Sequence, residues 1–181
     1  MKDMASDIER VLISEEKIKD KVSEIGKKIS KDYAGKDLML IGILKGSVPF
    51  MAHLMKEITI PCTMDFMAVS SYGNSTTSSG VVRILKDLDF EIEGKHLLIV
   101  EDIIDSGITL SYLLKYLKGR KPLSIDIACL LNKPDRRKAD LDVKYLGYDV
   151  PDEFLVGYGL DYAEHYRNLP YIGILKEEIY K

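Results

Sequence analysis

The sequence predicts an α/β fold in which a parallel, twisted sheet is flanked by helices and accompanied by a small hood lobe. Short apolar runs rich in branched residues are typical of buried strands, and they alternate along the chain with segments of helical periodicity. Strands that alternate with helices indicate a parallel sheet covered on both faces. After about residue 135 the pattern becomes shorter and irregular, which favours a small lobe there.

The expected elements follow in chain order. Ser14 has the side chain of an N-cap, and apolar residues then recur every three or four positions, which predicts a helix over about 15–33. Pro49 suits the first turn of a second helix, and a third helix is expected at 108–118, closed by Gly119. The strands are expected at 38–44, 62–72, 81–86, 96–100 and 124–131.

Length and composition bound the class of protein. We expect a single domain over 1–181, with the core at roughly 35–132 and the small lobe built from the N-terminal segment and roughly 135–181. The hydrophobic fraction of 46% and the charged fraction of 30% are those of a soluble globular protein. Because no apolar run reaches the roughly 18 residues of a membrane span and the first residues lack signal-peptide character, we expect a cytoplasmic protein without a membrane partner. The net charge of −3 does not favour nucleic acid as a partner.

The stretch LLIVEDIIDSGITL, residues 97–110, places three carboxylates at the end of an apolar strand. Ionised Glu101, Asp102 and Asp105 are costly to desolvate unless a ligand or ion pairs with them. The loop at 105–109 presents backbone N–H groups and two hydroxyls at a helix N-terminus, which is a place to bind phosphate. The alternative is an exposed acidic bias at the start of a helix. Three acids together with Ser-Gly-x-Thr favour a ligand site.

Four segments carry a resemblance to a known family. VEDIIDSGITL, residues 100–110, resembles the signature of the type I phosphoribosyltransferases, which bind phosphoribosyl pyrophosphate. LKGS at 44–47 resembles their pyrophosphate loop, and SSYGNSTTSSG at 70–80 resembles their lid. LLNKPDRR at 130–137 and DEFLVGYGLDYAEHYRNLP at 152–170 are similar to the purine-binding segments of hypoxanthine-guanine phosphoribosyltransferases. The resemblance covers nearly the whole chain, in order and with matching spacing.

The resemblance implies a purine-salvage enzyme with the type I phosphoribosyltransferase core. Such an enzyme transfers the phosphoribosyl group from phosphoribosyl pyrophosphate to N9 of hypoxanthine or guanine, and gives IMP or GMP and pyrophosphate. It uses Mg²⁺, and members of the family form homodimers or homotetramers. Two alternatives remain open: a regulator that senses phosphoribosyl pyrophosphate and binds RNA, and an enzyme that also accepts xanthine.

The resemblance also implies roles for individual residues. The 5′-phosphate would be held by Asp105, Ser106, Gly107, Ile108 and Thr109, and Asp105 would exchange a proton with purine N7 as the catalytic residue. The ribose hydroxyls would contact Glu101 and Asp102, and the metal would be held by Glu101, Asp102 and Asp161. Pyrophosphate would be bound by Lys45, Gly46 and Arg167. The purine would be bound by Lys133, Phe154 and Leu155, and the lid would include Ser71 and Tyr72.

Two further expectations concern neighbouring residues. In the family the peptide before the pyrophosphate-loop lysine can be cis, so Leu44-Lys45 is the place to look for it. The run Arg136-Arg137-Lys138 has the pattern of a solvated charge run, with a subunit contact as the alternative.

Overall fold

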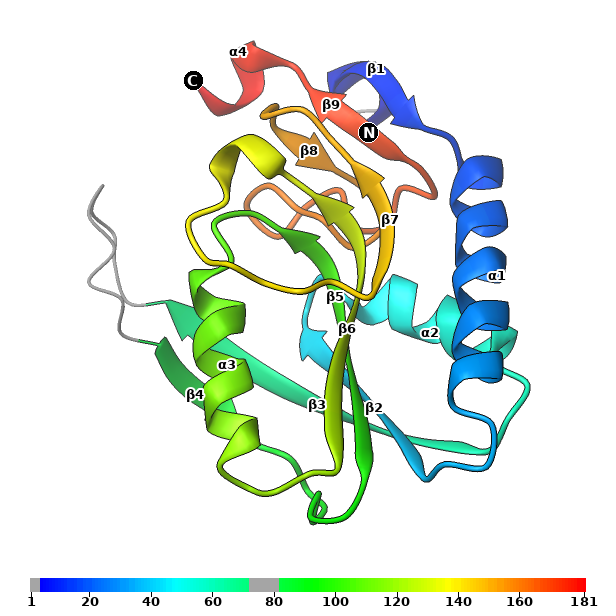
Figure 1. Cartoon of the computed structure of the whole chain (residues 1–181). Helices are drawn as coiled ribbons and strands as arrows, with labels where there is room; N and C mark the ends of the chain where they lie inside the picture. The colour runs from blue at the N-terminus through cyan, green and yellow to red at the C-terminus, as the bar shows by residue number, and fades with distance from the viewer. Residues whose placement is uncertain (1–3, 72–81) are drawn as a thin grey trace.

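The computed structural model describes residues 4–71 and 82–181, and it contains a mostly parallel sheet of six strands in the order β4-β3-β2-β5-β6-β7 (Figure 1). The antiparallel pair is β3 with β4, and the other neighbours run parallel. The six strands are β2 (Leu38–Leu44), β3 (Cys62–Ser71), β4 (Val82–Lys86), β5 (His96–Ile104), β6 (Ser124–Asn132) and β7 (Tyr145–Asp149). The predicted α/β class is therefore confirmed.

A second sheet of three strands has the order β1-β9-β8. Its strands are β1 (Ile8–Ile13), β8 (Leu155–Val156) and β9 (Ile172–Leu175). Figure 1 shows this sheet at the end of the large sheet toward which β5 and β6 run. The large sheet itself continues past residue 135, because β7 pairs with β6. The division into a core and a small lobe near residue 135 stays a prediction.

Helices cover both faces of the large sheet. The helices are α1 (Glu15–Asp32), α2 (Val48–Glu57), α3 (Ile108–Lys118) and α4 (Glu177–Tyr180), with short 3₁₀ turns at η1 (Met4–Asp7) and η2 (Pro134–Arg136). Figure 1 shows α3 on one side of the sheet and both α1 and α2 on the other. None of the helices in the described parts of the chain is long and apolar enough to cross a bilayer.

Alternation along the central strands supplies both halves of the core. On β5, Leu98 and Val100 pack with α1 and α2, whereas Leu97 and Ile99 pack with α3. These four side chains are fully buried, and successive side chains of a strand point to opposite faces. A strand buried on both faces therefore reads as an unbroken apolar run, which is the pattern that predicted it.

The strand expected at 96–100 is longer than predicted. Backbone pairing with β6 continues to Ile103 and Ile104, so β5 ends at Ile104. Glu101 and Asp102 consequently lie within the strand rather than after it. The polar residues at 101 and 102 suggested that the strand ends before them. The hydrogen bonds between parallel strands use backbone groups only, so charged side chains do not end the pairing.

Candidate active site

Glu101 and Asp102 are consecutive residues of β5, so their side chains leave the strand on opposite faces. Burial raises the pKa of the Glu101 carboxyl well above its ordinary value, and the neighbouring Asp102 charge adds to the rise. Burial also raises the pKa of Asp102 to about 6, although the backbone N–H of Ile103 and the Arg167 guanidinium act in the opposite direction. Both carboxylates thus lack sufficient positive charge around them.

The loop after β5, which is predicted to bind phosphate, leads directly into α3. Gly107 has φ +76°, in the left-handed region that favours glycine, and α3 begins at the next residue. A cavity of about 270 Å³ lies against this turn and is lined by Ser106, Gly107 and Thr109, together with Glu101 and Asp105. Among the described residues that line it, none is Lys or Arg. Backbone N–H groups of the first helical turn and the hydroxyls of Ser106 and Thr109 are therefore the donors that an anion would meet here.

A larger cavity of about 770 Å³ is lined by two of the three residues predicted to bind a base. Its lining includes Lys133, Phe154 and Asp105, so Asp105 borders both cavities. The Lys133 ammonium donates to the backbone carbonyl oxygen of Glu153 at 2.9 Å. Leu155 follows in β8 and is buried. The structure thus brings two of the predicted purine residues, Lys133 and Phe154, and the predicted proton acceptor to one cavity, whereas Leu155 is not among the residues that line it.

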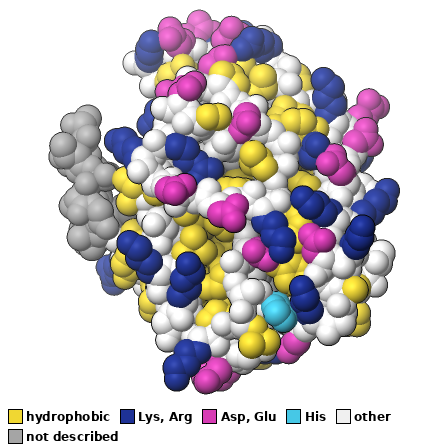
Figure 2. Space-filling view, in the orientation of Figure 1, with side chains coloured by type: hydrophobic (Ala, Val, Ile, Leu, Met, Phe, Trp, Pro, Cys, Tyr) yellow, Lys and Arg dark blue, Asp and Glu magenta, His cyan; other side chains and the backbone are white. Residues whose placement is uncertain are grey.

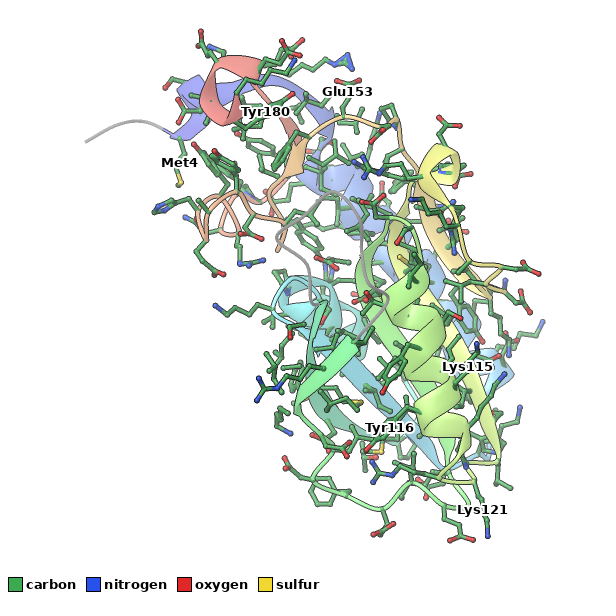
Figure 3. All side chains as sticks on the ribbon, turned by 90° about the vertical axis from the view of Figure 1, so that its left-hand side faces the viewer. Met4, Lys115, Tyr116, Lys121, Glu153 and Tyr180 are labelled. Carbon is green, nitrogen blue, oxygen red and sulfur yellow. The ribbon has the colours of Figure 1, made fainter. Side chains whose placement is uncertain are left out.

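The ring of Phe154 lies among other aromatic side chains. It stacks on Tyr180 of α4 with ring centroids 4.7 Å apart and planes 24° apart, and it meets the edge-on ring of Tyr162 at 5.5 Å. Figure 3 shows Tyr180 and Glu153 at the same end of the molecule. The aromatic character of this side of the cavity comes from distant parts of the sequence.

The predicted pyrophosphate loop fits closely between two neighbours. The peptide between Leu44 and Lys45 is cis. A methyl group on Gly46 would lie 1.7 Å from Asp102 Oδ2, and one on Gly159 would lie 2.0 Å from the Gly46 carbonyl oxygen. Gly159 also has φ +103°, which other residues rarely adopt. Glycine at both positions lets the loop lie against the Asp102 carboxylate.

The two predicted pyrophosphate cations are held by carboxylates. Lys45 Nζ lies 3.0 Å from Glu164 Oε2, and Arg167 Nη2 lies 2.9 Å from Asp161 Oδ1. Arg167 Nη2 also approaches Glu164 at 3.4 Å, so the two cations share one acid. The Arg167 Nε is buried and has no hydrogen-bond partner. This arrangement presents cations whose acidic partners an anionic ligand could replace.

The residues fit a divalent metal that arrives with phosphate groups. Asp102 is a carboxylate disfavoured by burial, and the charge of nearby Asp161 further raises its pKa. Within the described residues, no group of three or more His, Cys, Asp or Glu side chains could hold a metal alone. Mg²⁺ commonly uses one or two carboxylates and completes its shell with water and substrate phosphates. The donor set suits that mode of binding rather than a protein cage.

Sequence reasoning missed the role of Arg136 in the site. Its side chain is about half exposed, as a solvated charge run implies, yet Arg136 Nε lies 2.6 Å from Asp105 Oδ1. Arg136 ends the 3₁₀ turn at 134–136, which follows Lys133, and it lines the same cavity as Lys133. The lid prediction is not tested: Ser71 ends β3, and Tyr72 lies outside the described residues.

One face of the molecule carries both signs of charge without segregating them (Figure 2). Figure 2 shows Lys and Arg interspersed with Asp and Glu over the visible face, without a continuous basic area. This distribution agrees with the small net charge of −3. An anionic ligand must therefore be held by local groups rather than by the field of the whole protein.

Comparison with known proteins gives a consistent likeness. The phosphoribosyl transferase domain family matches residues 12–163. A hypoxanthine-guanine phosphoribosyltransferase of Bacillus subtilis (strain 168) is 58% identical over 178 residues, which cover 98% of this chain and 99% of that protein. A hypoxanthine phosphoribosyltransferase structure from Staphylococcus aureus has a TM-score of 0.96 at 52% identity, covering 98% of this chain and 97% of that chain. A hypoxanthine-guanine phosphoribosyltransferase structure from Bacillus anthracis has a TM-score of 0.90 at 47% identity, covering 93% and 99%.

Proposed function

Because the chain belongs to the phosphoribosyl transferase family, we propose that it transfers the phosphoribosyl group of phosphoribosyl pyrophosphate to N9 of hypoxanthine or guanine. The products are IMP or GMP and pyrophosphate, and the reaction serves purine salvage. One observation carries the proposal: Asp105 borders both the phosphate-type cavity at α3 and the larger cavity with Lys133 and Phe154. A sugar bound in the first cavity and a base bound in the second would meet at this carboxylate.

The phosphoribosyl half is held by the end of β5 and the start of α3. Backbone N–H groups and hydroxyls of residues 105–109 bind the 5′-phosphate. Glu101 and Asp102 accept hydrogen bonds from the ribose hydroxyls, and their negative charge favours the positive charge that develops at C1 of the sugar. Mg²⁺, held by these carboxylates and Asp161 together with diphosphate oxygens, would offset charge on the departing pyrophosphate.

The base is held by donors and acceptors on complementary sides. The Lys133 ammonium is a donor without an acceptor, which matches the 6-oxo group of hypoxanthine and guanine. Asp105 accepts the proton of N7, and Phe154 supplies an apolar ring beside the base. The backbone carbonyl of Leu155 would receive the 2-amino group of guanine. Because that contact uses backbone, both 6-oxopurines are accepted.

The leaving pyrophosphate takes the place of protein carboxylates. Lys45 and Arg167 exchange their contacts with Glu164 and Asp161 for oxygens of pyrophosphate. The N–H groups around Gly46 add donors that carry no net charge. Ser71 and Tyr72 belong to a lid that would exclude water from the reacting sugar.

The working form of the protein also belongs to this proposal. We infer a homodimer or homotetramer in the cytoplasm, as its family resemblance implies, with small molecules rather than nucleic acid or membrane as partners. Light scattering in solution measures the oligomeric state directly. A monomer at micromolar concentration would contradict this part of the proposal without affecting the reaction.

Steady-state kinetics with four bases tests the function. Hypoxanthine, guanine, xanthine and adenine are compared at saturating phosphoribosyl pyrophosphate and Mg²⁺, with and without chelator. We expect turnover of the first two, loss of turnover in chelator, and adenine disfavoured by about 10⁴-fold, since a site built around one hydrogen bond rejects the mismatched analogue. Efficient use of adenine, or no transfer to any base, would contradict the proposal.

A further inference from the structure

Four charged side chains form a chain along the wall of the larger cavity. Arg136 lies 2.6 Å from Asp105 through its Nε, and its Nη1 lies 3.3 Å from Asp152 Oδ1. The same Asp152 oxygen lies 3.3 Å from Lys133 Nζ. Acidic and basic side chains thus alternate from Asp105, the predicted acceptor of the N7 proton, to Lys133, the predicted donor to the 6-oxo group. All four residues line the same cavity.

We propose that Arg136 is a positioning residue for the reaction, which holds the Asp105 carboxylate aimed at the base and couples it through Asp152 to Lys133. The inference rests on the proposed function, because it takes Asp105 as the acceptor of the N7 proton. Arg136 acts through its neighbours and does not itself touch the reacting atoms.

The surroundings of Asp105 make such a cation necessary. Five carboxyl groups line the two cavities that Asp105 borders, namely Glu9, Glu101, Asp152, Glu153 and Glu177, together with the phenol of Tyr180. Like charges repel one another, so a carboxylate in this setting needs a cation to hold it in one orientation. The cations lining these cavities are Lys133 and Arg136, and Arg136 makes the direct contact with Asp105.

The geometry leaves the carboxylate free to react. A carboxylate has two acceptor oxygens, so a guanidinium at Asp105 Oδ1 leaves Oδ2 able to receive a proton. Guanidinium stays charged at every pH at which the enzyme would work, and the acids beside Arg136 raise its pKa further, Asp105 most of all. The contact therefore orients Asp105 without competing for the proton.

Asp152 extends the same set of contacts to Lys133. Lys133 has three N–H donors, and it uses them toward the Glu153 carbonyl at 2.9 Å and toward Asp152 at 3.3 Å. One donor is left for the 6-oxo group of the base. N7 and the 6-oxo group are neighbours on a purine. Because Asp152 contacts Lys133 directly and Asp105 through Arg136, it keeps the distance between Lys133 and Asp105 matched to the base.

The experiment compares Arg136→Ala, Arg136→Lys and the control Lys138→Ala, which removes an exposed positive charge two residues away. We measure kcat for hypoxanthine and the KM for phosphoribosyl pyrophosphate separately. For an exposed ion pair, we expect Arg136→Ala to lower kcat by about threefold, with little change in that KM. Arg136→Lys restores part of kcat because it keeps a cation beside Asp105, and Lys138→Ala leaves both constants unchanged.

A double-mutant cycle completes the test. Because Arg136 acts through Asp105, Arg136→Ala should cost little further kcat when it is added to Asp105→Asn. An unchanged kcat in Arg136→Ala, an equal loss in both backgrounds or no rescue by Arg136→Lys would overturn the inference, because a purely structural role is independent of the Asp105 carboxylate. If those results came with normal transfer to hypoxanthine by the unmodified protein, the proposed function would stand. If the unmodified protein transferred nothing, both would fall.

Discussion

Replacing Asp102 with Asn should stabilise the folded protein at neutral pH while it weakens the binding of phosphoribosyl pyrophosphate with Mg²⁺. Burial raises the pKa of Asp102 from 3.8 to about 6, so the folded state holds this proton more tightly than the unfolded chain does. The favourable contribution of protonated Asp102 is complete below about pH 3.8 and is lost as the pH rises through about 6. Above that range the folded protein contains a carboxylate that burial disfavours.

The magnitude follows from the two pKa values. Each tenfold change in an ionisation constant corresponds to about 1.4 kcal/mol. Relative to a protonated Asp102 in both states, the raised pKa therefore lowers the free energy of unfolding by about 3 kcal/mol at about pH 7.5 and by about 1 kcal/mol at about pH 4.5. Asn has nearly the same shape, and its side-chain oxygen can still accept from the backbone N–H of Ile103, as Asp102 Oδ1 does at 2.9 Å. The amide therefore removes the charge without opening a cavity.

Urea denaturation at the two pH values measures the effect. With a slope of about 2 kcal/mol per molar urea, the midpoint of Asp102→Asn should exceed that of the unmodified protein by about 1 M or more at about pH 7.5, and by less at about pH 4.5. Asp140→Asn, at an exposed position in the loop after β6, is the matched control and should change little at either pH. Adding phosphoribosyl pyrophosphate with Mg²⁺ should raise the midpoint of the unmodified protein more than that of Asp102→Asn.

A midpoint for Asp102→Asn that is equal to or below that of the unmodified protein at neutral pH would refute the reasoning. It would mean that Arg167 and the backbone N–H groups already compensate the buried charge. A gain that is the same at both pH values would also refute it, because the cause would then be packing rather than ionisation.

Three further substitutions test the site. Asp105→Asn should lower kcat by about 10²–10⁴-fold, the range for one acid–base group, with a much smaller change in the KM for phosphoribosyl pyrophosphate; near-normal kcat in rapid-quench assays would exclude Asp105 from proton transfer. Lys133→Ala should lower kcat/KM for hypoxanthine and narrow its margin over adenine, and an unchanged ratio between the two bases would contradict the assignment. Gly159→Ala should raise the KM for pyrophosphate in the reverse reaction and lower the free energy of unfolding by about 2 kcal/mol or more, since the added methyl meets the Gly46 carbonyl oxygen at 2.0 Å and the backbone has φ +103°. Unchanged stability in urea would show that the loop moves aside freely.

Periodicity predicted most of the fold because the large sheet is buried on both faces. The helix expected at 15–33 is observed at Glu15–Asp32, and its N-cap is Ser14, whose Oγ accepts from the N–H of Lys17 at 3.4 Å. The predicted end of β5 was wrong because it was inferred from composition, whereas backbone pairing determines where a strand ends. The pairing of β1 with β9 joins Ile8 to Leu175, and no local pattern announces a contact between residues so far apart.

The spacing of the motifs predicted the positions of whole segments better than it predicted contacts between individual side chains. The loop after β5 lies at the start of α3 as expected, and Asp105 and Lys133 reach one cavity. The contact of Arg136 with Asp105 depends on the direction of a single 3₁₀ turn, which sequence alone does not determine. The same holds for the stacking of Phe154 on Tyr180, because it requires α4 to lie beside β8.

The central position of β9 in the three-stranded sheet has a consequence for protein synthesis. Both β1 and β8 pair with β9, so β1 leaves the ribosome long before its partner exists. At typical elongation rates of about 5–20 residues per second, β9 follows β1 by roughly 8–30 s, by which time every strand of the large sheet has been made. Ile174 and Leu175 of β9 line the larger cavity together with Asp105. The nascent chain should therefore complete the large sheet first. It should become able to bind a base only when β9 inserts between β1 and β8.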